Sequence, residues 1–79
     1  MNKRVKLSRL VREVNALAMK ADNDSTLQML YDGEVIAEYE CWGMYEPDAK
    51  TPEEWVRGNS VFLIDLQGRD INKVTLAMK

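Results

Sequence analysis

Glutamates recur at every second position in one stretch of the chain, which is the spacing of side chains that share one face of a β-strand. The even-numbered positions from 34 to 42 hold Glu34, Ile36, Glu38, Glu40 and Trp42. We expect all five side chains to point to solvent, opposite a face that packs on the core. Three further candidates follow in the next segment: Tyr45, Glu46 and Asp48. These eight residues form the candidate protein-binding surface.

A surface of this kind suits binding better than catalysis. Neighbouring carboxylates on one strand face, such as Glu38 and Glu40, lie about 7 Å apart, a separation that also suits glycoside hydrolysis. A chain of 79 residues offers no evident cleft around such a pair, so we expect no enzymatic activity. The carboxylates would attract a basic partner, and Trp42 would anchor it. The alternative is that the glutamates are only a solvated face and Trp42 covers the edge of a small core.

Other catalytic and metal-binding chemistries lack the residues that they need. The sequence has no histidine and one cysteine, Cys41, which excludes histidine-based catalysis and leaves soft-ligand metal sites unsupported. Asp22 and Asp24 open a segment similar to a calcium loop, but Leu27 stands where that loop requires glycine. Cys41 alternates with inward apolar residues, so we expect it in the core. We therefore expect no cofactor and no bound metal.

The net charge of −2 hides three blocks of different sign. Positions 1–20 carry a net charge of +5, positions 21–54 carry −9 and positions 55–79 carry +2. Such asymmetry points to charged partners and not to a particular fold. The acidic block predicts a partner with a basic surface, such as a protein that binds nucleic acid. In size and composition the chain looks like the small phage-encoded inhibitors of host nucleases and defence complexes, so we expect an inhibitor or adaptor.

The basic block indicates an alternative function, which is binding to nucleic acid through phosphate contacts. The candidate residues are Lys3, Arg4, Lys6, Arg9 and Arg12. Glu13 lies one helical turn from Arg9 and partly neutralises its charge. The exposed positions also lack the density of Asn, Gln and Arg that reads base edges. We therefore rank nucleic acid below a protein partner.

The elements that must position these residues follow from the apolar periodicity. Apolar residues recur at spacings of three and four from Leu7 to Ala21, which predicts an amphipathic helix over residues 6–21. Alternating patterns predict strands over residues 26–31 and 34–42.

Gly33 suits the left-handed position of a three-residue hairpin loop between these strands. That loop pairs Met29 with Val35 and Leu27 with Ala37, so that all four join the apolar face. A two-residue loop would place Glu38 opposite Leu27 on the core side, which disfavours it.

The second half of the chain predicts a short helix and two more strands. Thr51–Glu54 is a helix-start signal, and Gly58 is expected to end that helix after Arg57. Residues 60–66 are apolar on both sides around Val61–Ile64, which predicts a central strand, and residues 71–78 alternate as a last strand. The predicted fold is therefore an α+β domain of order α-β-β-α-β-β, with a mostly antiparallel four-stranded sheet and the long helix on one face.

All 79 residues are expected to form one small domain. No stretch of about 18 apolar residues is present, and Arg9, Arg12 and Glu13 interrupt the apolar run that a signal peptide needs. An unpaired cysteine suits a reducing compartment, so we expect the cytoplasm. The last strand is expected at a sheet edge, where it could pair with its copy in a homodimer.

Overall fold

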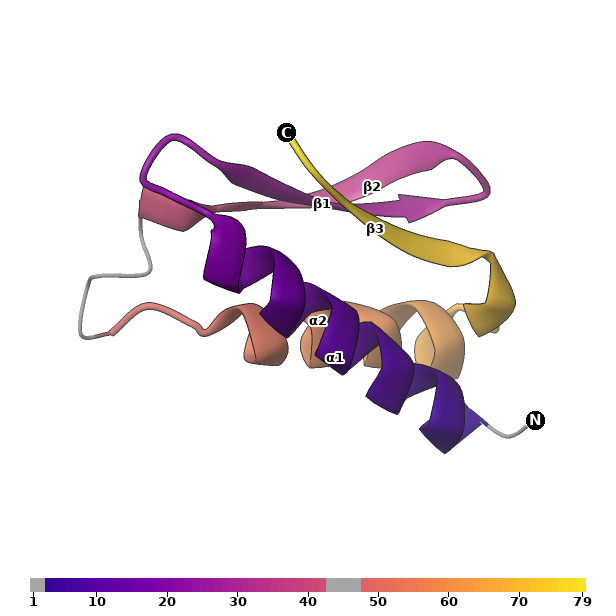
Figure 1. Cartoon of the computed structure of the whole chain (residues 1–79). Helices are drawn as coiled ribbons and strands as arrows, with labels where there is room; N and C mark the ends of the chain where they lie inside the picture. Colours follow the sequence, from indigo (N-terminus) through magenta and orange to yellow (C-terminus); the bar gives the residue numbers. More distant parts are fainter. Residues whose placement is uncertain (1–2, 43–47) are drawn as a thin grey trace.

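The computed structural model describes residues 3–42 and 48–79, and it places two helices against one face of an antiparallel sheet (Figure 1). The elements in chain order are α1 (Lys3–Lys20), β1 (Thr26–Tyr31), β2 (Glu34–Glu40), α2 (Pro52–Val61), the π-helical segment η2 (Phe62–Leu66), the 3₁₀ turn η3 (Ile71–Lys73) and β3 (Val74–Met78). The strand order is β2-β1-β3. The predicted α+β class is confirmed, but the described residues form three strands and not four.

The first helix and the first two strands are confirmed, with different bounds for two of them. α1 begins at residue 3 and not at 6, β1 has the predicted bounds, and β2 ends at Glu40, before the predicted end at Trp42. Helix α1 buries Leu10, Val11 and Val14 against the core. The helix is followed by a turn in which the Asp24 backbone N–H donates to the Asp22 carboxylate at 2.9 Å. Side chains that accept such local bonds compete with the helical pattern, so α1 ends before this turn.

The hairpin between β1 and β2 corrects the predicted register. Asp32 and Gly33 both have positive φ, 53° and 86°, and they form a two-residue turn between the paired residues Tyr31 and Glu34. A turn with positive φ at both positions matches the twist of a hairpin. The predicted three-residue loop is therefore wrong.

A β-bulge in β2 keeps Glu38 out of the core despite the two-residue turn. Leu30 pairs with Val35, whereas Met29 pairs with Ala37, so Ile36 is the extra residue in β2. From there on the register is displaced by one position. Glu38 consequently lies opposite Gln28, on the side away from the core, and not opposite Leu27.

The strand predicted over residues 60–66 is wrong, because this stretch is helical. Helix α2 begins as predicted: Thr51 Oγ1 accepts a hydrogen bond of 3.1 Å from the Glu54 backbone N–H. It then continues through Gly58 to Val61 and passes into η2. The buried residues of the two segments recur at helical spacing: Trp55, Val56, Ser60, Leu63 and Ile64. A run of apolar residues fits a central strand or a half-buried helix equally well, and here the helix buries them.

The last predicted strand is shorter than expected. Residues Ile71–Lys73 form η3, and the Asp70 side chain accepts from the Asn72 backbone N–H at 2.9 Å at its start. Strand β3 then pairs with β1, with Met29 opposite Leu76. β3 is an outer strand, as the homodimer hypothesis requires; the dimer itself stays a prediction.

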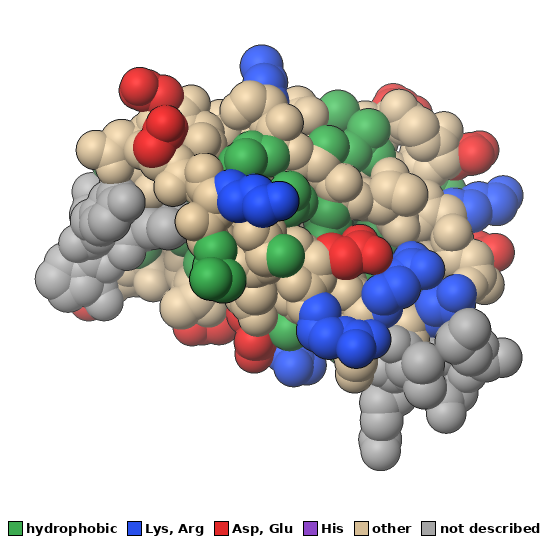
Figure 2. Space-filling view, in the orientation of Figure 1, with side chains coloured by type: hydrophobic (Ala, Val, Ile, Leu, Met, Phe, Trp, Pro, Cys, Tyr) green, Lys and Arg blue, Asp and Glu red, His purple; other side chains and the backbone are tan. Residues whose placement is uncertain are grey.

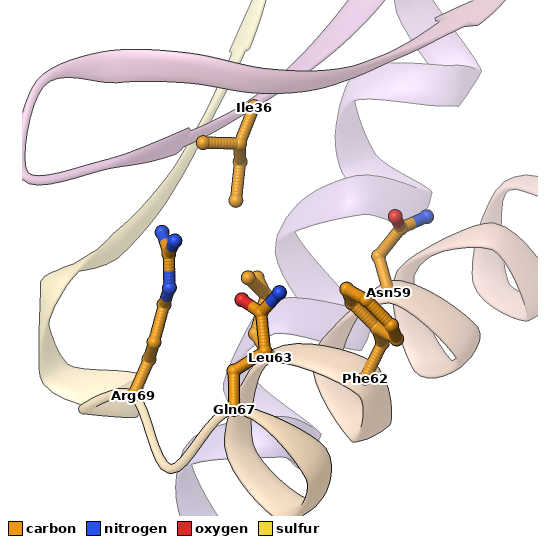
Figure 3. Close-up of a pocket in the computed structure, with 6 residues that line it drawn as sticks. All are labelled: Ile36, Asn59, Phe62, Leu63, Gln67 and Arg69. Carbon is orange, nitrogen blue, oxygen red and sulfur yellow. The ribbon is translucent and has the colours of Figure 1, made fainter.

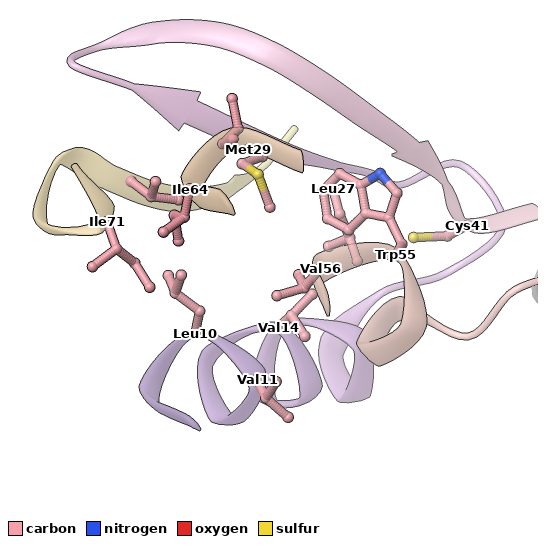
Figure 4. Close-up of a cluster of buried hydrophobic side chains, with 12 residues drawn as sticks. Leu10, Val11, Val14, Leu27, Met29, Cys41, Trp55, Val56, Ile64 and Ile71 are labelled. Atoms are coloured by element: carbon pink, nitrogen blue, oxygen red, sulfur yellow. The ribbon is translucent and has the colours of Figure 1, made fainter. Parts of the chain in front are cut away.

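The core lies between the sheet and the two helices (Figure 4). The buried apolar side chains of the described residues come from every layer: Leu10, Val11, Val14, Leu27, Met29, Cys41, Trp55, Val56, Leu63, Ile64, Ile71 and Val74. In Figure 4, side chains of α1 reach toward those of β1, and Val56 of α2 lies near Val14. Both helices therefore cover the same face of the sheet, and the carboxylates of β2 can be placed relative to that face.

Candidate protein-binding surface

Two of the predicted carboxylates lie together on the face of the sheet that points away from the helices. Glu38 pairs with Gln28, and Glu40 pairs with Thr26; both glutamates are exposed. The Gln28 side-chain amide donates a hydrogen bond of 3.2 Å to the Glu38 carboxylate. Because directly paired residues share a face of the sheet, Gln28 belongs to the same surface, although the alternation within β2 gave no sign of it.

Trp42 extends this surface just past the end of β2. Its indole nitrogen donates a hydrogen bond of 2.6 Å to the Glu40 carboxylate. The side chain nevertheless remains 56% exposed. A hydrogen bond to an ionised acceptor is short and strong, so it holds the ring next to the two carboxylates. We call Gln28, Glu38, Glu40 and Trp42 the acidic strand surface.

Two predicted members of this surface lie elsewhere. Ile36 is the bulge residue and lines a pocket on the helix side of β2 (Figure 3), so its predicted position on the solvent face is wrong. Glu34 pairs with Tyr31. Tyr31 follows the outward-facing Leu30 in β1, so it points to the helix side of the sheet. Glu34 therefore belongs to the helix side at the hairpin end, and its predicted place beside Glu38 is wrong as well. The cause is the same in both cases, since the bulge reverses the alternation of β2 on its two sides.

The rest of the predicted surface is only partly described. Asp48 is exposed and lies in a turn before α2. Tyr45 and Glu46 lie outside the described residues, so their part in the surface stays a prediction.

The basic residues of the alternative hypothesis lie on α1, in the other layer of the molecule. Figure 2 shows Lys and Arg side chains gathered toward the end where the chain begins. The Arg9 Nε atom lies 3.5 Å from the Glu13 carboxylate, so Glu13 partly neutralises the charge of Arg9, as expected. Arg12 and Lys20 are exposed and Lys6 is half-buried. The side chains of Lys3 and Arg4 lie outside the described part of the chain.

Cys41 is a core residue, as predicted from its position in the strand pattern. Its side chain is fully buried, and burial raises the pKa of the thiol, while a hydrogen bond with the Leu27 backbone opposes that rise. Burial also raises the pKa of the neighbouring Tyr39, and the negative charges of Cys41 and Glu54 add to that effect. The Tyr39 hydroxyl donates to the Lys50 carbonyl. A raised pKa keeps the thiol protonated and therefore a poor nucleophile.

Comparison with protein-family models, with characterised proteins and with solved structures found no significant match for this chain. Within residues 3–42 and 48–79, no cluster of three or more Cys, Asp or Glu side chains has the geometry to hold a metal ion. None of the helices in that part of the chain is long and apolar enough to cross a membrane. The fold and the surface therefore define a class, a small α+β domain with an acidic outer sheet face, and the function must be argued from that surface.

Proposed function

We propose that this protein is a non-enzymatic binding module, an inhibitor or adaptor that docks on a basic protein surface through the acidic strand surface. The observation that carries the proposal is the hydrogen bond between Trp42 and Glu40. It holds an exposed indole directly beside a carboxylate on the face of the sheet opposite α1 and α2.

The carboxylates supply the long-range part of the recognition. Glu38 and Glu40 stand two positions apart on an outer strand, and both are exposed. Exposed charges of one sign increase the rate at which a partner of the opposite sign is encountered, and salt weakens this effect. A basic surface that normally holds nucleic acid is one partner with the required charge.

Trp42 supplies the short-range part. Tryptophan is enriched among the residues that dominate binding energy, because a large ring loses contact with water over a wide area. The bond to Glu40 restrains the ring before a partner arrives, which lowers the entropy that is lost on binding.

The test compares three forms of the protein as bait in lysate pull-downs at two salt concentrations, followed by mass spectrometry. The variant Glu38→Lys/Glu40→Lys reverses the charge of the surface. The control Glu34→Lys/Asp24→Lys makes the same change in net charge at exposed positions outside it. We expect a protein that the wild type and the control capture at low salt and that the first variant loses.

Kinetics with that protein then test the mechanism. Replacing Glu38 and Glu40 is expected to reduce the association rate and to flatten its dependence on salt. Equal loss of binding in the control variant would mean that net charge and not this surface is recognised. Capture that is unaffected in both variants would contradict the proposal.

The nucleic-acid alternative makes a separate prediction. The candidate basic residues of α1, among which Arg12 is exposed, would produce a gel shift at low salt that disappears steeply as salt increases. We expect no shift with double-stranded or single-stranded probes. A shift that Arg12→Met abolishes would favour nucleic acid over a protein partner.

A further inference from the structure

A pocket of about 280 Å³ lies on the helix side of β2, separate from the acidic strand surface (Figure 3). Its lining residues come from β2, from the helical segments and from the loop after them: Ile36, Asn59, Phe62, Leu63, Gln67 and Arg69. In Figure 3, Ile36 points from β2 toward the helical side, and Arg69 extends from its loop toward β2. The sequence pattern gave no sign of this pocket, because it assigned Ile36 to the solvent face and residues 60–66 to a strand.

Two irregularities of the backbone meet at this pocket. Ile36 is the residue that the β-bulge adds to β2, and Phe62 and Leu63 belong to the π-helical segment η2. Bulges and π-helical turns both redirect side chains, and both are frequent at functional sites. Each irregularity places an apolar side chain in the wall of the same pocket.

The apolar wall remains accessible. Phe62 is 51% exposed and Ile36 is half-buried, whereas Leu63 is buried and forms the floor of the wall. Binding of a ligand that removes large apolar side chains from water is favourable, in proportion to the apolar area that is buried. The pocket therefore favours an apolar group as its occupant.

Arg69 adds a positive charge at the side of this wall. Its backbone N–H donates to the Leu63 carbonyl at 2.9 Å, and its guanidinium carbon lies 5.1 Å from the centre of the Tyr31 ring. Within the described part of the chain, no carboxylate lies within ion-pair distance of this guanidinium. Gln67, beside it in the lining, carries two further N–H donors in its side-chain amide. The polar side of the pocket is thus suited to an anion, and to a carboxylate in particular.

The size of the pocket limits how the apolar group and the carboxylate can be connected. At about 280 Å³ the pocket lies at the lower limit for drug-sized ligands, which is about 300 Å³, so its ligand is compact. An apolar group and a carboxylate that belong to one residue meet this limit. In a polypeptide, only the C-terminal residue can carry both an apolar side chain and a carboxylate, because the main-chain carboxylate is found there.

We propose that this pocket binds the C-terminal residue of a partner protein that ends in an apolar residue of leucine size. The side chain contacts Ile36, Phe62 and Leu63, and the terminal carboxylate binds the Arg69 guanidinium. This site is independent of the acidic strand surface, because β2 separates the two.

The test is an NMR titration of the whole protein with a pentapeptide that ends in leucine. The same peptide with an amidated C-terminus lacks the charge, and N-acetylleucine lacks the preceding peptide. We expect saturable shifts of the backbone signals of Ile36, Leu63, Gln67 and Arg69 with the free carboxylate. Amidation should weaken binding about tenfold or more, since hydrogen bonds between charged groups are lost.

Two variants test the residues of the site. Arg69→Met should weaken binding of the free carboxylate about tenfold and leave the amidated peptide unchanged. Phe62→Ala should weaken both, and because Phe62 is half exposed the fold should persist. Arg12→Met is the matched control, since it removes the same charged group from an exposed position on α1.

The proposal is overturned if the amidated peptide binds as well as the free carboxylate, or if Arg69→Met has no more effect than Arg12→Met. It is also overturned if N-acetylleucine binds as tightly as the pentapeptide, because the pocket then takes a small carboxylic acid. Loss of protein capture through Glu38→Lys/Glu40→Lys affects none of these outcomes, so the two proposals fail independently.

Discussion

The indole nitrogen of Trp42 donates a hydrogen bond of 2.6 Å to the carboxylate of Glu40, two residues earlier in the chain. The bond joins the end of β2 to the segment that follows it, and it leaves more than half of the indole side chain exposed. An exposed aromatic ring that is already oriented is a suitable anchor for a partner.

Replacing Trp42 with alanine should therefore raise the dissociation rate of the captured partner about tenfold or more. Trp42→Phe keeps an aromatic ring but loses the bond to Glu40, so a smaller increase is expected. Both can be measured by surface plasmon resonance. Leu66→Ala, at another exposed apolar position, is the control and should leave the rate unchanged. An unchanged rate in Trp42→Ala would contradict the role of the ring.

Two methionines that differ in burial should differ in how much they contribute to stability. Met29 is fully buried in the central strand, whereas Met19 on α1 is 88% exposed. Met29→Ala should lower the free energy of unfolding by about 2–5 kcal/mol, because it leaves a cavity. Met19→Ala should change it by less than about 0.5 kcal/mol. Urea denaturation followed by circular dichroism measures both, and similar effects at the two sites would contradict the packing described.

Two glycines should respond to alanine in opposite directions. A Cβ atom at Gly58 or at Gly33 meets no other atom within 4 Å, so packing does not distinguish the two sites. Gly58 lies inside α2, where alanine should raise the free energy of unfolding by about 0.5–1 kcal/mol. Gly33 has a φ of +86°, which costs a residue with a side chain about 1–2 kcal/mol. Thermal unfolding of the two variants decides this, and destabilisation by Gly58→Ala would argue that α2 ends where the sequence pattern predicted.

Cys41 should make stability depend on alkaline pH. Burial raises the pKa of its thiol in the folded protein. Above the ordinary thiol pKa of about 8.5, the unfolded chain loses this proton while the folded protein still holds it. The free energy of unfolding should consequently fall as the pH rises from 8 to 10.

The control for this pH effect is Cys41→Ala, which retains Tyr39 and all other groups. Its free energy of unfolding should start lower, since a buried side chain is shortened, but should fall less steeply over the same range. Equal slopes for the two proteins would show that the thiol does not titrate differently on folding. A thiol reagent should likewise modify the native protein far more slowly than the urea-unfolded chain.

Local pattern was sufficient for the first half of the fold. The helical spacing from Leu7 onward predicts α1, and the alternation from Thr26 predicts β1, because each signal is contained within the element itself. Glu38 and Glu40 were placed on the correct face for the same reason. The error in the register did not change their face. The two-residue turn and the bulge at Ile36 each displace the pairing by one position in the same direction, and a total shift of two positions leaves each side chain on the same face of the sheet.

The amino-acid sequence alone establishes which residues are apolar, where the charges lie and that a helix starts at Thr51. Tertiary structure decided two things that short-range pattern leaves open. The run Val61–Ile64 became helical because Leu63 and Ile64 then join the buried side of α2, so the expected fourth strand does not form from these residues. Ile36 turned toward the helices because two pairings with β1, on either side of it, differ by one residue. The helical run Val61–Ile64 and the inward position of Ile36 both depend on contacts between distant parts of the chain. Together they form the walls of the pocket at Arg69.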